Sequence, residues 1–290
     1  MDKQNIPVIM SGRNLADQLQ ETMKDETNAL KRQGIVPGLG TVLVGDDPAS
    51  ATYIAMKHKA CEDVGMASIH AQLPKDVSQS DLEATLRDIN MNPEVDAYIV
   101  QLPLTPGLNE ESALMAVDPE KDADGLHPVN LGRLVMGAPG PLPCTPAGIV
   151  ELLIHYGVSI EGKHVVIVGR GLTIGRPLAL LLSLKRPNCN AAVTVIHTGV
   201  EQMGYYTRQA DILVAAAGSP GLISADMVKP GAAVVGAGLT RVGKKLHSDV
   251  EDSVSEVAGW VTPRIGGVGP MTVAMLLQNT ITAAKKRLVK

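Results

Sequence analysis

A strand, a glycine-rich turn and a helix follow one another over residues 163–182, and this succession constrains the fold more than any other stretch. Residues 165–168 are an apolar β-branched run, typical of a buried parallel strand, and Gly169, Gly171 and Gly175 then lead into a leucine-rich helix. Glycines allow close approach to a pyrophosphate, and the free N–H groups at a helix start favour its charge. The stretch predicts a dinucleotide site. Because its spacing is one residue longer than the usual fingerprint, a turn that serves packing alone remains an alternative.

The end of the next predicted strand, residues 191–196, indicates which dinucleotide is bound. An NAD enzyme normally has an acidic residue there for the ribose hydroxyls, whereas this chain has His197 and Thr198. Nothing acidic would repel a 2′-phosphate, and Arg170 in the glycine turn would pair with one, so the sequence favours NADP over NAD. The alternative for Arg170 is a solvated loop side chain.

Strands alternate with helices along the chain, which predicts an α/β fold with parallel sheets and right-handed crossovers. The length of 290 residues suits two domains. The predicted strands are 38–44, 67–73 and 97–101, with further strands at Val165, Val193, Ile212 and Ala233; the predicted helices include 14–33, 50–64, 145–155 and 272–288.

Two helix starts are predicted from capping residues, at the capping box of residues 80–83 and at Thr145, which is followed by Pro146. Between them, residues 118–143 are rich in Gly, Pro and Asp and are expected to be irregular, apart from a short helix around Leu131.

Composition excludes several classes of function. The net charge of −4 gives no basic footprint for nucleic acid or for a membrane surface. Three scattered cysteines argue against a disulfide framework and for a reducing compartment, and no pair has metal-ligand spacing. No signal peptide and no membrane-spanning run is apparent, so we expect a cytoplasmic protein with no metal.

Lys57 is the most unusual candidate catalytic residue. Ile54, Lys57, Cys61 and Val64 have the spacing of one buried helix face, so the lysine interrupts an apolar stripe. Tyr53 lies one turn earlier on nearly the same side. A desolvated ammonium has a lowered pKa, which suits proton transfer. A lysine whose stem covers apolar surface while its head reaches water explains the pattern equally well.

Two further polar sites follow the predicted strand at 97–101. Gln101 stands at its carboxyl end, where ligands gather in open α/β sheets, although a structural amide is the alternative. Glu120, Asp122 and Asp124 then mimic the start of a calcium loop, but Leu131 at the twelfth position excludes calcium. One of these carboxylates is expected to accept hydrogen bonds from a heterocycle or to close an Asx turn.

Several separate blocks, in order, resemble the bifunctional methylenetetrahydrofolate dehydrogenase/cyclohydrolases, and the resemblance covers almost the whole chain. The blocks are GDDPASATYIAMKHKACEDVGM (45–66), VQLPL (100–104), PEKDADGLHPVNLGRL (119–134), PCTPAGIVELL (143–153), VVIVGRGLTIGRP (165–177) and GGVGPMT (266–272).

The resemblance implies two reactions at one cleft between two α/β domains, the second of Rossmann type. NADP would accept a hydride from 5,10-methylenetetrahydrofolate, and water would open the methenyl product to 10-formyltetrahydrofolate. The lysine matching Lys57 would be the central catalytic group, Tyr53 would orient the folate, Gln101 would tune the lysine and Asp124 would hold the pterin.

The resemblance also implies the domain ranges, the binding sites and the partners. Residues 1–144 with 270–290 would form the folate domain and 145–269 the NADP domain, in a homodimer that serves purine biosynthesis and binds tetrahydrofolate derivatives. The implied folate-binding residues are Tyr53, Lys57, Val100, Gln101, Leu102, Asp124, Ile265, Gly266, Gly267, Gly269 and Thr272. The implied cofactor-binding residues are Gly169, Arg170, Gly171, Thr173, Gly175, His197, Thr198, Gly218, Gly238 and Leu239.

The chain departs from the family pattern at several places in or near these sites. Many members have serine where Gly171 stands, which removes a hydroxyl for the cofactor phosphate; Arg264 and Ile265 replace a valine–proline pair; residues 236–238 and 247–249 also differ. Three alternatives therefore remain: a cyclohydrolase without hydride transfer, a nucleotide-binding module without catalysis, and a dehydrogenase of a small non-folate acid.

Overall fold

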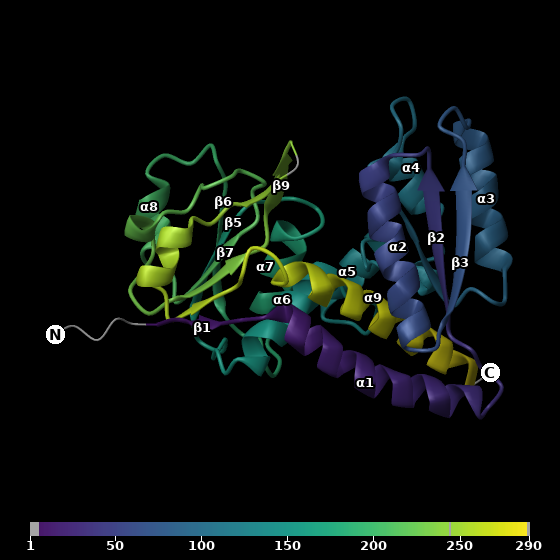
Figure 1. Ribbon diagram of the computed structural model, residues 1–290, viewed down its shortest axis with the longest axis horizontal. Helices are drawn as coiled ribbons and strands as arrows, with labels where there is room; N and C mark the ends of the chain where they lie inside the picture. The colour runs from purple at the N-terminus through teal and green to yellow at the C-terminus, as the bar shows by residue number, and fades with distance from the viewer. Residues whose placement is uncertain (1–5, 244, 289–290) are drawn as a thin grey trace. The chain divides into compact units, whose positions relative to one another are not determined.

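The chain forms two compact units in the computed structural model, which describes residues 6–243 and 245–288 and, for residues 48–52, the backbone alone (Figure 1). One, here called the six-stranded unit, comprises Met1–Ala16 and Thr145–Thr272; the other, the three-stranded unit, comprises Asp17–Cys144 and Val273–Lys290. Residues 1–5, part of the segment predicted not to be a signal peptide, lie outside the described residues.

This division differs from the predicted ranges at the N-terminus, where residues up to Ala16 belong with the six-stranded unit. The reason is strand pairing: β1 (Val8–Ile9) lies parallel to β11 (Trp260–Val261), so the start of the chain extends the larger sheet. The units also divide between Cys144 and Thr145, and residues 270–272, expected in the folate domain, lie in the six-stranded unit.

The three-stranded unit is built on a parallel sheet of order β3-β2-β4, formed by β2 (Gly38–Val44), β3 (Ala67–Leu73) and β4 (Ala97–Val100). Every residue of β2 and β4 is buried, as expected of apolar runs in a covered parallel sheet. The edge strand β3 alternates between exposed and half-buried residues. The three strands have the predicted positions.

Helices cover both faces of this sheet (Figure 1). Leu82 and Leu86 of α3 (Gln79–Met91) pack in one core with Val42 and Tyr98 of the sheet. On the other side α2 (Pro48–Asp63) contacts β2 and β3. The unit also contains most of α1 (Gly12–Lys31), α4 (Glu110–Met115), the 3₁₀ turn Pro119–Lys121, α5 (Pro128–Met136) and the C-terminal part of α9 (Val268–Lys285).

The six-stranded unit has one parallel sheet of order β1-β11-β8-β7-β5-β6. The chain passes from β5 to β6 on one side and returns to β7 on the other, so the strand order reverses between β5 and β7. In open α/β sheets such a reversal marks the ligand-binding edge at the carboxyl ends of the strands. The sheet and its accompanying elements are β5 (His164–Val168), β6 (Ala192–Ile196), β7 (Ile212–Ala215), β8 (Ala233–Gly236), the hairpin β9 (Leu239–Val242) and β10 (Lys245–Ser248), α6 (Cys144–His155), α7 (Gly175–Ser183) and α8 (Met203–Thr207).

Both predicted helix starts differ from the structure. The helix α6 begins at Cys144, so Thr145 lies in its first turn, where its hydroxyl bonds that of Thr272. The cap of α3 is Ser78, whose side chain accepts a hydrogen bond from the backbone N–H of Asp81, and Ser80 lies inside the helix. Both serines have an acidic residue three positions later, so the capping box fits either position in the sequence. The short helix expected around Leu131 is confirmed as α5, nine residues long with Pro128 at its start.

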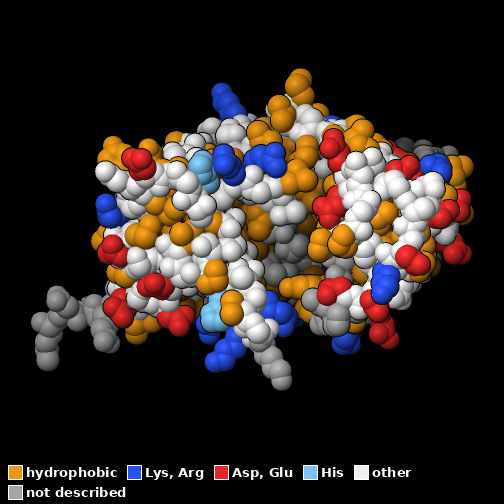
Figure 2. Space-filling view, turned by 90° about the horizontal axis from the view of Figure 1, so that it is seen from above, with side chains coloured by type: hydrophobic (Ala, Val, Ile, Leu, Met, Phe, Trp, Pro, Cys, Tyr) orange, Lys and Arg blue, Asp and Glu red, His pale blue; other side chains and the backbone are white. Residues whose placement is uncertain are grey.

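The described helices include none that is both long enough and apolar enough to cross a bilayer. On the face seen in Figure 2, Lys and Arg side chains lie in small groups separated by acidic, polar and apolar ones.

Two glycine substitutions in the three-stranded unit test this packing. A Cβ at Gly40 would lie 2.7 Å from the Cβ of Tyr98, whereas one at Gly132, inside α5, would meet nothing within 4 Å. We expect Gly40→Ala to lower the free energy of unfolding by about 1–3 kcal/mol through overpacking. We expect Gly132→Ala to raise it by about 0.5–1 kcal/mol, because alanine loses less backbone entropy. Urea unfolding midpoints measure both, and equal midpoints would contradict the packing described.

Candidate active site

Lys57 lies within the three-stranded unit, and its ammonium forms a hydrogen bond to a side chain of the same unit. Its neighbours on the α2 stripe, Ile54, Cys61 and Val64, are buried, and Lys57 itself is half-buried. Its Nζ donates a hydrogen bond of 3.0 Å to Oε1 of Gln101, the first residue after β4. The lysine therefore engages the carboxyl end of the sheet through Gln101.

Burial and charge act on Lys57 in opposite directions. Dehydration lowers the pKa of its amine from the usual 10.5, while the nearby carboxylate of Asp124 and the thiol of Cys144 raise it in part. The carboxyl group of Asp124 shows the converse: burial raises its pKa, and the charge of Lys57 lowers it in part. An amine and a carboxyl whose pKa values both move towards neutrality are suited to exchanging protons with a bound molecule.

The structure gives different surroundings to the three carboxylates, Glu120, Asp122 and Asp124, between which the sequence did not decide. Asp122 closes the Asx turn: its Oδ1 accepts from the N–H of Gly125 at 3.0 Å, and its Oδ2 accepts from the N–H of His127 and from Nδ2 of Asn130. Glu120 is occupied by ion pairs. Asp124 is the carboxylate whose charge faces Lys57, and among the described residues it accepts no side-chain or backbone hydrogen bond.

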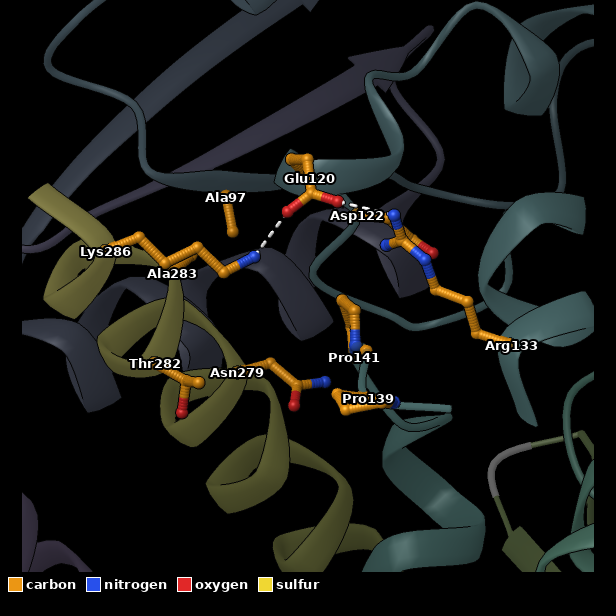
Figure 3. Close-up of a pocket in the computed structure, with 11 residues that line it drawn as sticks. Ala97, Glu120, Asp122, Arg133, Pro139, Pro141, Asn279, Thr282, Ala283 and Lys286 are labelled. Atoms are coloured by element: carbon orange, nitrogen blue, oxygen red, sulfur yellow. Dashed lines mark hydrogen bonds and ion pairs between the residues drawn. The ribbon is translucent and has the colours of Figure 1, made fainter. Parts of the chain in front are cut away.

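Glu120 holds the neighbouring surface of the unit together. Its carboxylate bridges Arg133 of α5 and Lys286 at the C-terminal end of α9 across a pocket (Figure 3). It contributes a structural link between two helices and does not belong to the group around Lys57.

The other predicted folate-binding residues divide between the two units. In the three-stranded unit, Tyr53 is 49% exposed and follows directly on the part of α2 described by its backbone alone. Val100 is buried at the end of β4, and the carbonyl of Leu102 accepts a hydrogen bond from Nε2 of Gln101. The structure thus brings Lys57, Gln101 and Asp124 together. The remainder, Ile265, Gly266, Gly267, Gly269 and Thr272, belong to the six-stranded unit.

In the six-stranded unit these residues form the turn before α9. Gly266 has φ = +79°, and its carbonyl accepts a hydrogen bond from the N–H of Arg13. Ile265 beside it is 74% exposed. Thr272 in α9 shares a hydrogen bond of 2.9 Å with the hydroxyl of Thr145. The turn is therefore fixed from its two ends and presents an exposed apolar side chain.

The glycine turn after β5 fits a pyrophosphate. Gly169 has φ = +130°, and a Cβ there would overlap the carbonyl oxygen of Ala216. A Cβ at Gly175 would in turn overlap the carbonyl of Gly169. The start of α7 has no side-chain cap at Ile174. The N–H of Arg176 donates to the carbonyl of Gly171 and Pro177 has no N–H, so among the described contacts of this first turn the N–H of Gly175 is the one left for a ligand. Gly171 differs from the others, because a Cβ at this position would meet nothing within 4 Å.

The cofactor residues beyond the turn lie at the ends of the neighbouring strands. At the end of β6, Nδ1 of His197 accepts from the N–H of Gly199, and Thr198 is exposed. Arg170 is exposed and forms no ion pair with any residue in 6–243 or 245–288. The exposed residues Thr173, at the glycine turn, and Leu239, at the start of β9, complete the predicted set.

Asp249 shapes this site, although the sequence analysis noted it only as part of the departing segment 247–249 and gave it no role. The fully buried carboxylate of Asp249 accepts hydrogen bonds from the N–H groups of Ala217 at 2.7 Å, Gly218 at 2.9 Å and Ser219 at 2.7 Å. It lies so close to Gly238 that a Cβ there would overlap it. Asp249 thereby fixes the loop after β7, which contains the predicted cofactor residue Gly218.

Comparison with known proteins identifies the family of both parts of the chain. The family model described as tetrahydrofolate dehydrogenase/cyclohydrolase, catalytic domain, matches residues 10–124, and the corresponding NAD(P)-binding domain matches residues 143–288. The bifunctional protein FolD of Syntrophotalea carbinolica is 56% identical over 279 residues, which are 96% of each chain.

Solved structures show the same similarity. The bifunctional FolD of Campylobacter jejuni is 41% identical with a TM-score of 0.93, covering 97% of this chain and 99% of the other. The FolD of Trypanosoma brucei, complexed with NADP cofactor and inhibitor, is 38% identical with a TM-score of 0.93, covering 98% and 99%. This chain belongs to the tetrahydrofolate dehydrogenase/cyclohydrolase family.

Proposed function

We propose that this chain catalyses two consecutive reactions of folate one-carbon metabolism. It oxidises 5,10-methylenetetrahydrofolate to the methenyl compound with NADP, and it hydrolyses the methenyl compound to 10-formyltetrahydrofolate. The observation that carries the proposal is the arrangement of Lys57, Gln101 and Asp124, an amine with a lowered pKa between an amide and a carboxyl with a raised one. The family membership supports both activities.

In the hydrolysis, Lys57 is the group that moves protons. Its neutral amine takes a proton from water as the water oxygen bonds to the methenyl carbon. The bond from that carbon to N5 of the pterin then breaks, N5 takes up a proton, and the new hydroxyl loses one to become the formyl carbonyl. One proton is released overall. The hydrogen bond from Lys57 to Gln101 holds the amine at the carboxyl end of β4 throughout.

Asp124 and Tyr53 have binding roles in this proposal. The Asp124 carboxyl has no hydrogen-bond partner among the described residues, so it is available to N–H groups of the pterin. Asp124 also keeps the pKa of Lys57 from falling further. Tyr53, partly exposed on the same helix, orients the folate.

The six-stranded unit binds the cofactor. The turn of Gly169 and Gly175 and the uncapped start of α7 hold the pyrophosphate, and Arg170, with His197 and Thr198, receives the 2′-phosphate. When bound there, NADP supplies the hydride acceptor for the first reaction. A serine side chain, expected at position 171 from the resemblance, would fit beside the backbone there. Packing therefore does not require the glycine at position 171.

Three finer assignments complete the proposal. The enzyme acts in the cytoplasm, as a homodimer, and its product supplies formyl groups for purine biosynthesis. Three buried cysteines without disulfides are compatible with a reducing compartment, and the dimer follows the expectation for the family.

Replacing Lys57 tests the hydrolytic mechanism. We expect Lys57→Met, which keeps the stem and removes the amine, to lower kcat of the cyclohydrolase about 100-fold or more. The matched control is Lys59→Met on the same helix, whose exposed ammonium pairs with Asp63 and faces away from the site. Absorbance of methenyltetrahydrofolate measures both steps. Retention of both activities by Lys57→Met would show the assigned mechanism to be wrong.

Replacing Arg170 tests the cofactor preference. Loss of a charge-assisted hydrogen bond to the 2′-phosphate is expected to raise KM for NADP about tenfold or more in Arg170→Ala, with little change for NAD. The control is Lys185→Ala, an exposed cation beyond the far end of α7. Equal effects on NADP and NAD would instead make Arg170 a solvated loop residue.

A further inference from the structure

The segment of residues 122–125, here called the Asp124 loop, is held by hydrogen bonds on both sides of the Asp124 carboxyl, which itself accepts none from the described residues. The Asp122 carboxylate is saturated by the donors of its Asx turn, and the N–H of Ala123 donates to the carbonyl of Tyr98 in β4 at 3.2 Å. The carbonyl of Asp124 accepts from the N–H of Cys144 at 3.1 Å. The loop is therefore built to hold one side chain in place.

The carbonyl of Ala123 is held from the C-terminal helix α9. Nδ2 of Asn279 in α9 donates to the carbonyls of Ala123 and Leu142, each at 2.9 Å. The thiol of Cys144 is the second donor to Ala123, at 3.2 Å, and Nδ2 of Asn279 also lies 3.5 Å from its sulfur. Asn279 thus ties the peptide immediately before Asp124 to the segment that leads into α6.

An amide donor suits this position. The two N–H groups of a carboxamide diverge in one plane, so a single Nδ2 can serve two carbonyls from separate segments. A buried carbonyl that loses its donor carries the full desolvation penalty, so the loop and α9 are held together at this point.

Asn279 lies on the wall of a pocket of about 460 Å³, which Asp122 also lines (Figure 3). Thr282 stands one turn further along the same wall, and its hydroxyl donates to the carbonyl of Gln278 in its own helix. Two residues of one helix therefore line the same pocket, and only Asn279 bonds the Asp124 loop.

We propose that Asn279 is a positioning residue for the reaction, holding Asp124 where its carboxyl meets both Lys57 and the pterin. The proposal rests on the function proposed above. Without the amide the peptide before Asp124 keeps one thiol donor, and the Asp124 carboxyl moves away from the Lys57 amine. A displacement of about 1 Å at such a site can cost on the order of 100-fold in rate.

Moving Asp124 away is expected to lower the pKa of Lys57. The groups acting on Lys57 are Asp124 and Cys144, and those acting on Asp124 are Lys57 and Asp122. When Asp124 retreats, Lys57 loses the negative charge that raises its pKa. The cyclohydrolase rate, which rises with pH as the amine loses its proton, then rises at lower pH.

The test compares Asn279→Leu, which keeps the volume, and Asn279→Ala with the control Thr282→Ala. For both Asn279 variants we expect kcat of the cyclohydrolase to fall about 10- to 100-fold, KM for the folate to rise, and the midpoint of the pH–rate profile to move to lower pH. KM for NADP and all properties of Thr282→Ala stay as in the parent enzyme.

Two results would overturn the proposal. The first is that both Asn279 variants keep the folate KM and the pH–rate midpoint of the parent enzyme. The other is a loss of activity that matches only the unfolded fraction measured by circular dichroism, which would make Asn279 structural. Absence of both activities in the parent enzyme would instead contradict the proposed function.

Discussion

The proposed chemistry depends on the hydrogen bond from Lys57 to Gln101 and on the charge of Asp124 near the lysine. A lysine on an apolar helix face is costly unless its charge finds partners, and here Oε1 of Gln101 accepts a hydrogen bond from the ammonium and Asp124 supplies opposite charge. Burial lowers the pKa of the amine, and the carboxyl limits that fall. The balance leaves an amine able to change its protonation state when a substrate arrives.

The architecture explains how three distant segments supply this group. Gln101 comes from the end of β4, Lys57 from the helix that covers the sheet, and Asp124 from the loop that pairs with β4 through Tyr98 and Ala123. Parallel strands end at one edge of a sheet, which places Gln101 at that edge, and the hydrogen bond from Lys57 brings α2 to the same point. The same rule places the glycine turn and the loop after β7 side by side in the other unit.

What the sequence predicted well was local. The positions of β2 and β3 follow from apolar runs bounded by turn residues, and Lys57 stood out because its spacing placed it on a buried stripe. The cap of α3 was misplaced because Ser78 and Ser80 offer the same local pattern.

What the sequence could not predict depends on contacts between distant segments. Asp122 and Asp124 are alike in composition and spacing, and only the donors of residues 125–130 assign the Asx turn to Asp122. Asp249 meets a loop about thirty residues away, and Asn279 meets Ala123 across 156 positions. No periodicity or motif within either segment signals such a partner.

The most direct measurement is the titration of the Lys57 amine itself, by NMR of protein labelled at lysine, with a Lys57→Arg spectrum to assign the signal. The account predicts a midpoint below the usual 10.5, and a further decrease when Asp124 is replaced by Asn. A midpoint at or above 10.5, unmoved by that replacement, would contradict it.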